Sequence, residues 1–360
     1  MTFDVVIVGG GPVGLVAAIE ARLAGLSAVV LEQRSGVIDK ACGEGLMPGA
    51  IPLLARLGVD PVGVPLRGIT YNQGTRSVTH RFAGEPGRGV RRTALHDALR
   101  ARALELGVEL CTSKVDSIDQ DESGVRVGAV QASTVQGSTV QASTVQASTV
   151  QTSYVLACDG LHSTVARLVG LTLPAPVRRR RYGIRQHYAV APWGDTVEIH
   201  YARSAEIYVT PIAPDEVGIA MLGAQHTDFD AVIAGIPDLA ARLAGATVAS
   251  SRRGAGPFRQ RTRARTAGRV MLVGDASGYV DAITGEGLRL GFAQAGAAIS
   301  CIVSGDPARY EIEWRRITRD FRITTTALVR IATSPLRRAI VPLSATLPGR
   351  FGAVVESLAR

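Results

Sequence analysis

At the start of this chain, the apolar positions follow first a strand pattern, then a helical spacing, and then a strand pattern again. Residues 3–8 form a short, continuously apolar run, which is typical of a strand buried on both faces. Residues 13–24 are rich in Ala and Leu at helical spacing and stop at Gly25, and residues 27–32 predict a second strand. The three segments predict one β-α-β unit, a motif of about 30 residues.

Longer-range patterning indicates how the rest of the chain is organised. Helical spacing recurs at residues 48–57, 93–106 and 286–303 and over most of 306–360. Further strands are predicted at 108–128 (a pair), 154–159 and 269–273. Alternating segments from about 178 to 223 predict an antiparallel sheet. Because β-α-β patterning resumes after this sheet, the expected class is α/β with a discontinuous second domain.

Residues 130–154 break this patterning. They read VQAST, VQGST, VQAST, VQAST and VQTSY, which are five copies of a pentapeptide. Side chains alternate between faces along a strand, so a period of five places successive Val residues on opposite faces. The array therefore predicts an inserted surface β-hairpin or loop that is dispensable for function.

Composition narrows the classes of protein. The chain has 360 residues, 46% of them hydrophobic and 20% charged, which suits a large core and excludes global disorder. Its four Cys are scattered without Cys/His clusters, so neither a metal site nor a disulfide framework is expected. The net charge is +9, but the basic runs at 178–181 and 252–265 lack interleaved aromatic residues and any nucleic-acid motif. We expect no nucleic-acid partner.

The sequence gives weaker evidence on the cellular location and oligomeric state of the protein. The chain enters its first strand without a basic, cleavable leader, and its longest apolar stretch, 290–304, is shorter than the roughly 18 residues of a membrane span. We expect a cytoplasmic monomer or homodimer without an integral membrane segment, with peripheral membrane contact as the remaining alternative.

The first chemical motif follows the first strand. Residues 9–14 read GGGPVG, a GxGxxG sequence between a predicted strand and helix. In such a loop, Gly9 permits the tight turn, Gly11 lets a pyrophosphate approach the backbone, and Gly14 allows close helix packing. The expected ligand contacts come from Gly9, Gly11, Pro12, Val13 and Gly14, and Glu32 is placed to accept hydrogen bonds from a ribose.

Two further segments give the chain a family resemblance. Together with the first motif, residues 268–276 (GRVMLVGDA) resemble the FAD-binding domain of aromatic-ring flavoprotein monooxygenases, geranylgeranyl reductases and flavin halogenases. The resemblance implies that Asp275 binds the ribityl chain of FAD. Residues 158–163 resemble the middle DG motif of that superfamily, which implies a cofactor contact for Asp159. Residues 91–96 resemble its R-x-x-L segment, which assigns Arg92 to the flavin.

Other segments point to particular branches of the superfamily. Residues 281–288 resemble the D-P-x-x-G-E-G stretch of reductases and halogenases, with Ala282 replacing Pro, and imply that Gly285, Gly287 and Leu288 contact the flavin. Residues 42–45 resemble the Cys-Gly-x-Gly of geranylgeranyl reductases, which makes Cys42 a candidate catalytic residue. No second strand–GxGxxG–helix unit exists, so NAD(P)H is expected as a transient reductant rather than a ligand of its own domain.

This resemblance suggests domain boundaries. The FAD-binding domain is expected at 1–65, 88–172 and 265–305, with the pentapeptide insertion at 130–154. The substrate domain is expected at 66–87 and 173–264. Residues 306–360 form a C-terminal helical region, which either packs on the FAD-binding domain or lines a lipophilic entrance.

The predicted antiparallel sheet would form the floor of the substrate pocket. Its candidate catalytic residues are His187, as a base for a phenol, and Tyr208. The segment 207–211 partly resembles an aromatic box of prenyl reductases but lacks its Trp and Phe. The first hypothesis is therefore a FAD-dependent monooxygenase that uses NAD(P)H and O2 to hydroxylate or oxidise an electron-rich aromatic, phenolic or polyketide-like lipophilic substrate. The alternatives are a FAD-dependent reductase of isoprenoid double bonds and a non-catalytic flavin-binding protein.

Overall fold

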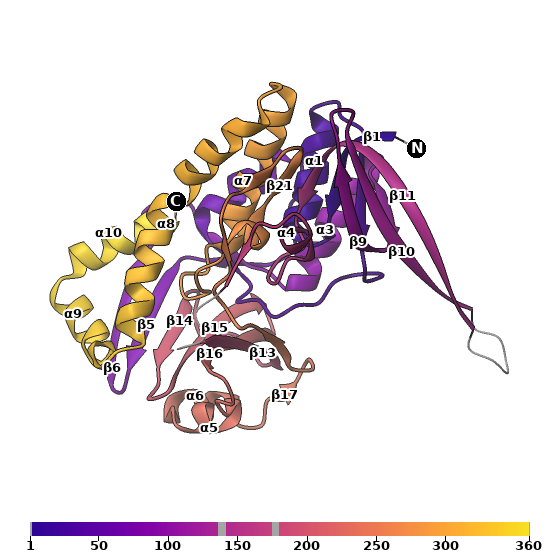
Figure 1. The fold of residues 1–360 in the computed structure, drawn as a ribbon. Coiled ribbons are helices and arrows are strands. Elements are labelled where there is room, and N and C mark those ends of the chain that lie inside the picture. Colours follow the sequence, from indigo (N-terminus) through magenta and orange to yellow (C-terminus); the bar gives the residue numbers. More distant parts are fainter. Residues whose placement is uncertain (1, 136–141, 175–179, 360) are drawn as a thin grey trace.

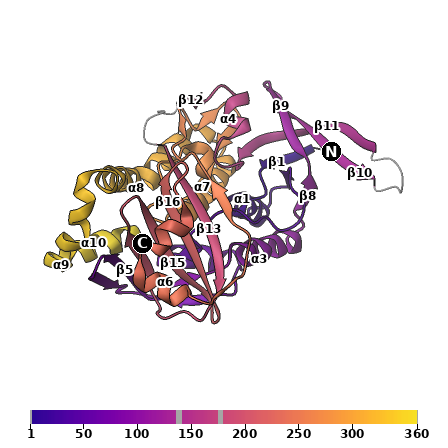
Figure 2. The ribbon, with the colours of Figure 1, turned by 90° about the horizontal axis from the view of Figure 1, so that it is seen from below.

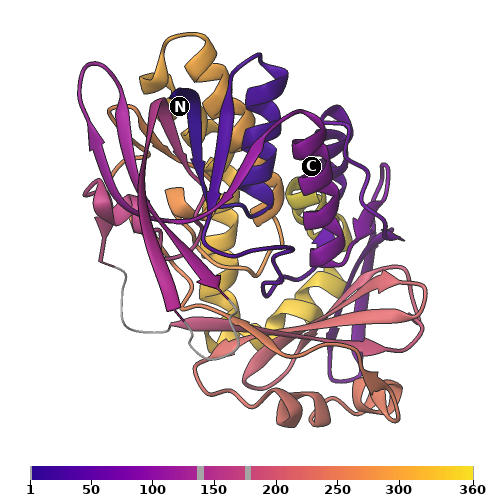
Figure 3. The same ribbon diagram turned by 90° about the vertical axis from the view of Figure 1, so that its right-hand side faces the viewer.

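A computed structural model describes residues 2–135, 142–174 and 180–359. Residues 136–141 of the pentapeptide array and residues 178–179 of the first basic run lie outside the described residues. The fold is α/β, as the sequence predicts, and contains two large sheets (Figure 1). Figure 3 shows the first sheet with its helices above the second sheet.

The first sheet has a parallel core. The order of its main strands is β20-β21-β11-β1-β2-β8. Their bounds are Thr266–Ala267 (β20), Val270–Leu272 (β21), Ala142–Ala157 (β11), Thr2–Val8 (β1), Ala28–Glu32 (β2) and Glu109–Thr112 (β8). β10 (Val125–Val135) pairs antiparallel with β11, and β9 (Lys114–Gln120) pairs antiparallel with β10, so these two strands extend the sheet. The last four residues of β1 and the first four of β2 are buried, as their continuous apolar sequences predict.

Helices cover both faces of this sheet. The helices on the first face are α1 (Pro12–Leu23), η1 (Pro48–Ala50), α2 (Ile51–Arg56), α3 (Arg92–Glu105) and α7 (Gly287–Val303). α4 (Thr164–Leu168) packs on the opposite face. Val5 and Ile7 point into the first core and Val6 and Val8 into the second, because successive side chains of a strand alternate.

The pentapeptide array forms both arms of a hairpin. β10 pairs with β11 in antiparallel register from Val125↔Thr152 to Val135↔Ala142. The prediction that the array is purely an insertion is wrong at its last copy, because Gln151 and Tyr154 pair with Thr2 and Val5 of β1 inside the parallel sheet. The strand expected to start at 154 therefore begins at Ala142. The array runs without a break from a hairpin into a central strand.

The second sheet is the predicted meander with four additional strands, β5, β6, β17 and β18. Its order is β17-β13-β16-β15-β14-β5-β6, and β18 pairs with β13. The bounds are Thr247–Val248 (β17), Arg181–Ala189 (β13), Glu216–Ala224 (β16), Ala205–Ala213 (β15), Val197–Tyr201 (β14), Gly68–Gln73 (β5), Arg76–Arg81 (β6) and Arg253–Ala255 (β18). α5 (Phe229–Ala234) and α6 (Pro237–Leu243) cover its outer face (Figure 2).

Short strands connect the main elements. β3 (Gly45–Leu46), β7 (Gly87–Gly89) and β4 (Val64–Leu66) form a small sheet, and β12 (Thr172–Leu173) pairs with β19 (Arg261–Thr262). Single 3-10 turns occur at η2 (Gly274–Ser277), η3 (Pro307–Arg309) and η4 (Pro335–Ala339).

The C-terminal helices pack against the cores of both sheets. α8 (Tyr310–Ala332) begins in the core, where Tyr310 donates a hydrogen bond to Leu272 O (3.0 Å) and Trp314 Nε1 donates to Ser277 Oγ (2.7 Å). α9 (Ile340–Thr346) and α10 (Pro348–Ala359) then lie along β5 and β6, where Phe351 meets Tyr71 edge-to-face at 5.0 Å between ring centroids. No helix in the described part of the chain is long and apolar enough to cross a membrane.

Candidate functional site: a cavity between the two sheets

The glycine-rich loop between β1 and α1 has the geometry that its sequence predicts. Gly9 has a φ of 104°, and a Cβ atom there would lie 2.6 Å from the carbonyl oxygen of Cys158. A Cβ at Gly14 would lie 1.9 Å from the carbonyl oxygen of Gly9, so the helix packs closely on the loop. At Gly11, by contrast, the nearest atom would be Arg92 Nη2, at 3.8 Å. The loop therefore leaves room for a phosphate beside the N-terminus of α1.

A cavity of about 420 Å³ extends from this loop to the second sheet. Most residues predicted to bind the cofactor line it, namely Gly9, Gly11, Pro12, Val13, Glu32, Arg92, Asp159, Asp275, Gly285, Gly287 and Leu288. Gly14 does not line the cavity and has the packing role just described. Residues from β1, β2, α3, α7 and the 3-10 turn after β21 (Gly274–Ser277), which are far apart in sequence, thus meet at one end of the parallel sheet, where α/β proteins bind their ligands.

Glu32 closes the loop from the neighbouring strand. Its Oε2 atom accepts a hydrogen bond from Gly10 N–H (2.8 Å), and Oε1 accepts one from Arg34 N–H (3.0 Å). Oε1 also accepts from Arg34 Nε (3.1 Å). These bonds fix the carboxylate at the cavity wall, and Oε2 retains capacity for a ribose hydroxyl.

Arg92 and Asp275 carry opposite charges in the buried wall. Arg92 is 7% exposed, and its Nη1 atom has no hydrogen-bond partner among the described residues. Burial raises the pKa of Asp275, and the positive charges of Lys40 and Arg92 oppose this effect. A buried guanidinium nitrogen without a partner favours an anionic or carbonyl-bearing ligand, because leaving such a donor unpaired is costly.

Asp159 differs from the other predicted contacts. Its Oδ1 atom accepts from Ser163 Oγ (2.6 Å) and its Oδ2 atom accepts from Val165 N–H (3.1 Å). Burial raises the pKa of this carboxyl, and these hydrogen bonds counteract the increase. The side chain therefore holds the start of α4, although the residue also lines the cavity.

The loop before α7 brings backbone to the cavity. Gly285 has a φ of 71°, and a Cβ atom there would have no neighbour within 4 Å. Glu286 is 1% exposed, with Oε2 bonded to Arg289 Nε and Oε1 without a partner among the described residues. Burial raises the pKa of Glu286 to about 7. Because α7 starts at Gly287, its positive end faces the cavity.

The other end of the cavity is mainly apolar. Its lining side chains include Ile69, Val197, Ile199, Leu222 and Phe258, with Leu328 of α8 and Val355 of α10. We call this end the apolar lobe. The C-terminal helices thus contribute directly to the site.

Tyr208 and Cys42 line the cavity, as expected of candidate catalytic residues. The Tyr208 hydroxyl donates to Ile283 O (3.0 Å), and burial raises its pKa well above the usual value. Burial also raises the pKa of Cys42, while the charge of Arg92 lowers it to a lesser extent. The Cys42 thiol is therefore favoured over the thiolate, which makes it a poor nucleophile.

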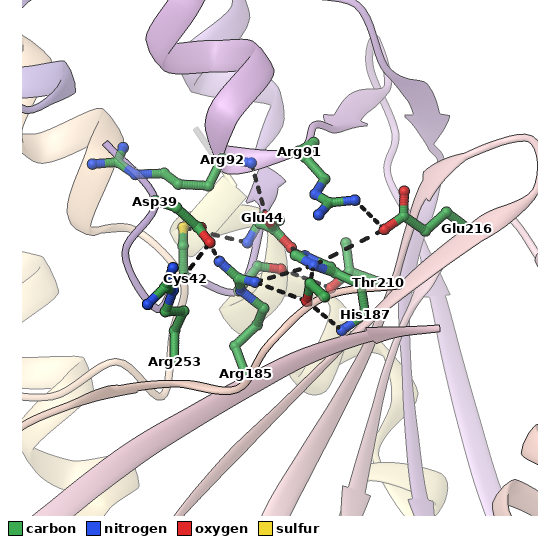
Figure 4. A network of polar contacts seen from close by, with 12 residues as sticks. Asp39, Cys42, Glu44, Arg91, Arg92, Arg185, His187, Thr210, Glu216 and Arg253 are labelled. Atoms are coloured by element: carbon green, nitrogen blue, oxygen red, sulfur yellow. Dashed lines mark hydrogen bonds and ion pairs between the residues drawn. The ribbon is translucent and has the colours of Figure 1, made fainter. Parts of the chain in front are cut away.

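His187 lies behind the wall rather than in it. It is fully buried on β13 and is not among the cavity-lining residues. Its Nε2 atom lies 2.6 Å from Oε2 of Glu44, which does line the cavity (Figure 4). In this arrangement Glu44, not His187, contributes to the wall of the cavity. Sequence reasoning missed Glu44, although it is the variable residue of the Cys-Gly-x-Gly segment and the one charged side chain there.

A glycine loop at a helix N-terminus, an acid after the second strand and a cavity at one end of the parallel strands define a dinucleotide-binding protein of the α/β class. Comparison with protein families identifies the family within this class to which the chain belongs. Residues 2–303 match the model described as FAD binding domain, so the chain belongs to that family. The residues present fit FAD, since the loop leaves space at Gly11 and Arg92 has a buried, unpaired donor. The protein is a FAD-dependent oxidoreductase.

Two curated relatives indicate the range of this family. A menaquinone reductase of Mycolicibacterium smegmatis is 27% identical over 88% of this chain and 80% of its own length. A 12-dehydrotetracycline 5-monooxygenase/anhydrotetracycline 6-monooxygenase of Streptomyces rimosus is 28% identical over 82% of this chain. The match covers 61% of that monooxygenase.

Solved structures show the same fold. A flavin-dependent brominase superimposes with a TM-score of 0.83 at 19% identity, covering 100% of this chain and 94% of its own. The p-nitrophenol 4-monooxygenase of Pseudomonas putida superimposes with a TM-score of 0.78 at 20% identity. The superposition covers 99% of this chain and 97% of the monooxygenase chain.

Proposed function

We propose that the protein is a monooxygenase that uses FAD, NAD(P)H and O2 to hydroxylate or oxidise an electron-rich aromatic, phenolic or polyketide-like lipophilic substrate. The observation that carries this proposal is the continuity of one cavity from the dinucleotide loop to the apolar lobe. Polar groups of Glu44, Tyr208 and Thr210 lie on its wall, where an aromatic hydroxyl can be bound. Relatives whose names describe oxygenation of tetracyclines and rifampicin support the same reading.

The chain's own residues divide into groups by the part of FAD that they would hold. Gly9, Gly11 and Gly14 shape the pyrophosphate site, with the first turn of α1 at Pro12 and Val13. Glu32 would bind the ribose, Asp275 the ribityl hydroxyls and Arg92 a carbonyl or phosphate oxygen. Gly285, Gly287 and Leu288 would meet the ring. Bound FAD would accept a hydride from NAD(P)H and activate O2.

The apolar lobe would position the substrate and keep water from the reacting atoms. Closure by Leu328 and Val355 makes a dry surface for a lipophilic ring system. Tyr208 would act mainly by holding the loop at Ile283, because its hydroxyl proton is already committed to that carbonyl.

The proposal extends to the cellular setting. It includes NADPH or NADH as a transient reductant, a role in secondary metabolism, a cytoplasmic location and a monomeric or homodimeric state. It also includes peripheral contact with a membrane, supported by exposed apolar side chains of the C-terminal region at Ile331, Leu336, Leu343 and Leu347. We propose the domain boundaries given above as part of the same account, except that the last copy of the array, which pairs with β1, belongs to the FAD-binding domain.

Reduction of an isoprenoid double bond is the second candidate. The observation in its favour is the similarity to the menaquinone reductase, which spans most of both chains. The experiment that separates the two candidates is oxygen uptake by the FAD-loaded protein with NAD(P)H, with and without phenolic polyketides. Substrate-stimulated oxygen uptake supports the monooxygenase. Saturation of a prenylated quinone under anaerobic conditions, without such uptake, would establish the reductase instead.

A further inference from the structure

The Glu44 carboxylate is held from two sides at the wall of the cavity. Oε1 accepts a hydrogen bond from Arg92 N–H (2.8 Å), and Oε2 lies 2.6 Å from His187 Nε2. The residue is 3% exposed, and its φ of 60° lies in the left-handed region, which is unfavourable for a residue with a Cβ atom. Backbone strain of this kind occurs frequently at functional sites.

The contacts of His187 fix the position of its ring proton. Nη1 of Arg185 lies 3.0 Å from Nδ1 of His187. The same Nη1 atom lies 3.3 Å from Ser250 Oγ, which in turn lies 2.7 Å from Nδ1. A guanidinium can only donate hydrogen bonds, so its position beside Nδ1 favours a ring nitrogen without a proton, whose single lone pair accepts from the Ser250 hydroxyl. The ring proton is therefore on Nε2, where it is donated to Glu44 Oε2. This assignment makes His187 neutral and Glu44 a carboxylate that accepts two N–H groups (Figure 4).

Ser250 continues this chain of contacts outward. Its Oγ atom lies 2.7 Å from His187 Nδ1 and accepts the His187 backbone N–H at 3.2 Å. Ser250 is half-exposed, whereas His187 and Glu44 are buried. A hydroxyl can accept one proton while it donates another. The contacts therefore run unbroken from the cavity through Glu44, His187 and Ser250 to the protein surface.

Other charged groups surround the histidine and balance one another. Arg185 is ion-paired with Asp39, which also accepts from Arg253 Nε at 3.2 Å. Glu216 on β16 lies 3.9 Å from His187 Nδ1 but is ion-paired with Arg91. Arg185 and Arg253 therefore share Asp39, and Arg91 pairs with Glu216, so each of these cations has a carboxylate partner.

We propose that Glu44 is the acid–base group of the cavity and that His187 and Ser250 exchange its proton with solvent. This inference rests on the proposed function. From the tautomer described, the Ser250 hydroxyl proton moves to Nδ1, the Nε2 proton moves to Glu44, and Ser250 regains a proton from water. While Nδ1 carries its proton, Arg185 Nη1 donates to Ser250 Oγ (3.3 Å) rather than to Nδ1. Glu44 then protonates a group in the cavity. When Glu44 later accepts a proton from a substrate hydroxyl, the reverse transfers restore the first tautomer, so protons balance over one cycle.

The alternative is that the same contacts only pin the loop containing Glu44 to β13. A matched pair of variants separates the two, since Ser250→Thr and Ser250→Val have nearly equal volume and differ in the hydroxyl. The measurements are FAD binding and NAD(P)H-dependent oxygen consumption over a range of pH, in H2O and D2O. His187→Gln is the second test, because a Gln amide can still donate to Glu44 but cannot relay a proton. The exposed neighbour Ser251 provides the control Ser251→Ala.

We expect all four variants to bind FAD as the unmodified protein does. Ser251→Ala should retain its turnover. Ser250→Val and His187→Gln should lose on the order of 10²-fold and lose the D2O effect, and Ser250→Thr, which keeps the hydroxyl, should turn over faster than Ser250→Val and keep the D2O effect. Equal turnover of Ser250→Thr and Ser250→Val, or full turnover of His187→Gln, would overturn the proposal.

A readout without turnover tests the same geometry. The 15N chemical shifts of His187 should show the ring proton on Nε2, and a proton on Nδ1 would contradict the assignment. Failure of the unmodified protein to bind FAD or to oxidise NAD(P)H would instead refute the proposed function, so the two failures are distinguishable.

Discussion

The hydroxyl of Tyr208 on β15 donates a hydrogen bond to the carbonyl oxygen of Ile283, 3.0 Å away in the loop that precedes α7. This bond joins the second sheet to the loop that would hold the flavin ring. Tyr208 and Ile283 are 75 residues apart in sequence. The substrate floor and the cofactor site are therefore connected by a specific contact as well as by a shared cavity.

Tyr208→Phe should have a small and mainly structural effect. Loss of one buried hydrogen bond should lower the free energy of unfolding by about 1 kcal/mol. Because burial raises the pKa of Tyr208, a phenolate there does not contribute, and the alkaline side of the pH profile should be unchanged. Thermal unfolding and the pH dependence of oxygen consumption check both points. A loss of alkaline activity specific to this variant would show that Tyr208 is itself an acid or base.

Asp275→Ala and Asp159→Ala should separate cofactor binding from helix capping. Asp275→Ala should weaken FAD binding by about 1.5–3 kcal/mol, because a ribityl hydroxyl loses a charged acceptor. Asp159→Ala should lower the stability of the apoprotein by about 1 kcal/mol, because its carboxylate holds the start of α4. Flavin fluorescence titration and calorimetry measure the two effects. Equal loss of FAD affinity in both variants would restore Asp159 as a direct ligand.

Stability should depend on pH through Glu286. Its pKa is raised from 4.5 to about 7, so the unfolded chain loses this proton at lower pH than the folded protein. The protonated Glu286 carboxyl therefore stabilises the folded protein fully below pH 4.5. The free energy of unfolding then falls by up to about 3 kcal/mol as the pH rises to about 7. Glu286→Gln should flatten the dependence of unfolding free energy on pH between 5 and 8. Denaturant titrations at several pH values measure this dependence. If the unfolding free energy of Glu286→Gln changes with pH as steeply as that of the unmodified protein, the raised pKa of Glu286 is refuted.

The hairpin should tolerate shortening only when its register is preserved. Removing residues 131–135 and 142–146 deletes five mutually paired positions and leaves Val130 opposite Ala147, with residues 136–141 as the connection. This variant should keep FAD binding and melting temperature. Deleting 131–150 should instead abolish folding, because it joins Val130 directly to Gln151 and prevents β10 from pairing with β11. Loss of soluble protein in the register-preserving variant would show that the array has a further role.

Adjacent valines of α10 test the apolar lobe. Val355 is 1% exposed and lines the cavity, whereas Val354 is 44% exposed. Val355→Trp should reduce binding of lipophilic ligands at least tenfold while FAD binding is retained, because the indole occupies the lobe. Val354→Trp, on the same helix, should bind both as the unmodified protein does. Isothermal titration with a polycyclic phenol provides the measurement, and equal affinities would show that the lobe is not the ligand site.

Local patterns predicted those parts of the fold that depend on neighbouring residues. The β1-α1-β2 unit and its glycine loop were found because apolar period, turn residues and the acid at Glu32 all occur within 30 residues. The pairing of Tyr154 with Val5 was not predicted, since nothing in a period-five repeat indicates that its last copy lies beside β1. Long-range register depends on tertiary packing rather than on local sequence.

The residues of the cavity show the same contrast between local motifs, which could be predicted, and long-range contacts, which could not. Glu32, Arg92 and Asp275 were found because each belongs to a motif that can be read locally. Glu44 was missed because its significance depends on His187, which is 143 residues away in sequence. A single sequence contains no signal for that contact. It also could not show that His187 is excluded from the cavity by the side chain it contacts.

Isotope labelling tests the central claim, oxygen insertion by a FAD-dependent enzyme, most directly. The FAD-loaded protein is supplied with NADPH or NADH and 18O2, and a panel of phenolic polyketides is screened for product by mass spectrometry. The account predicts a hydroxylated product that carries one atom of 18O and forms only when FAD is bound. A product that gains two hydrogens and no label, formed equally well without oxygen, would contradict it.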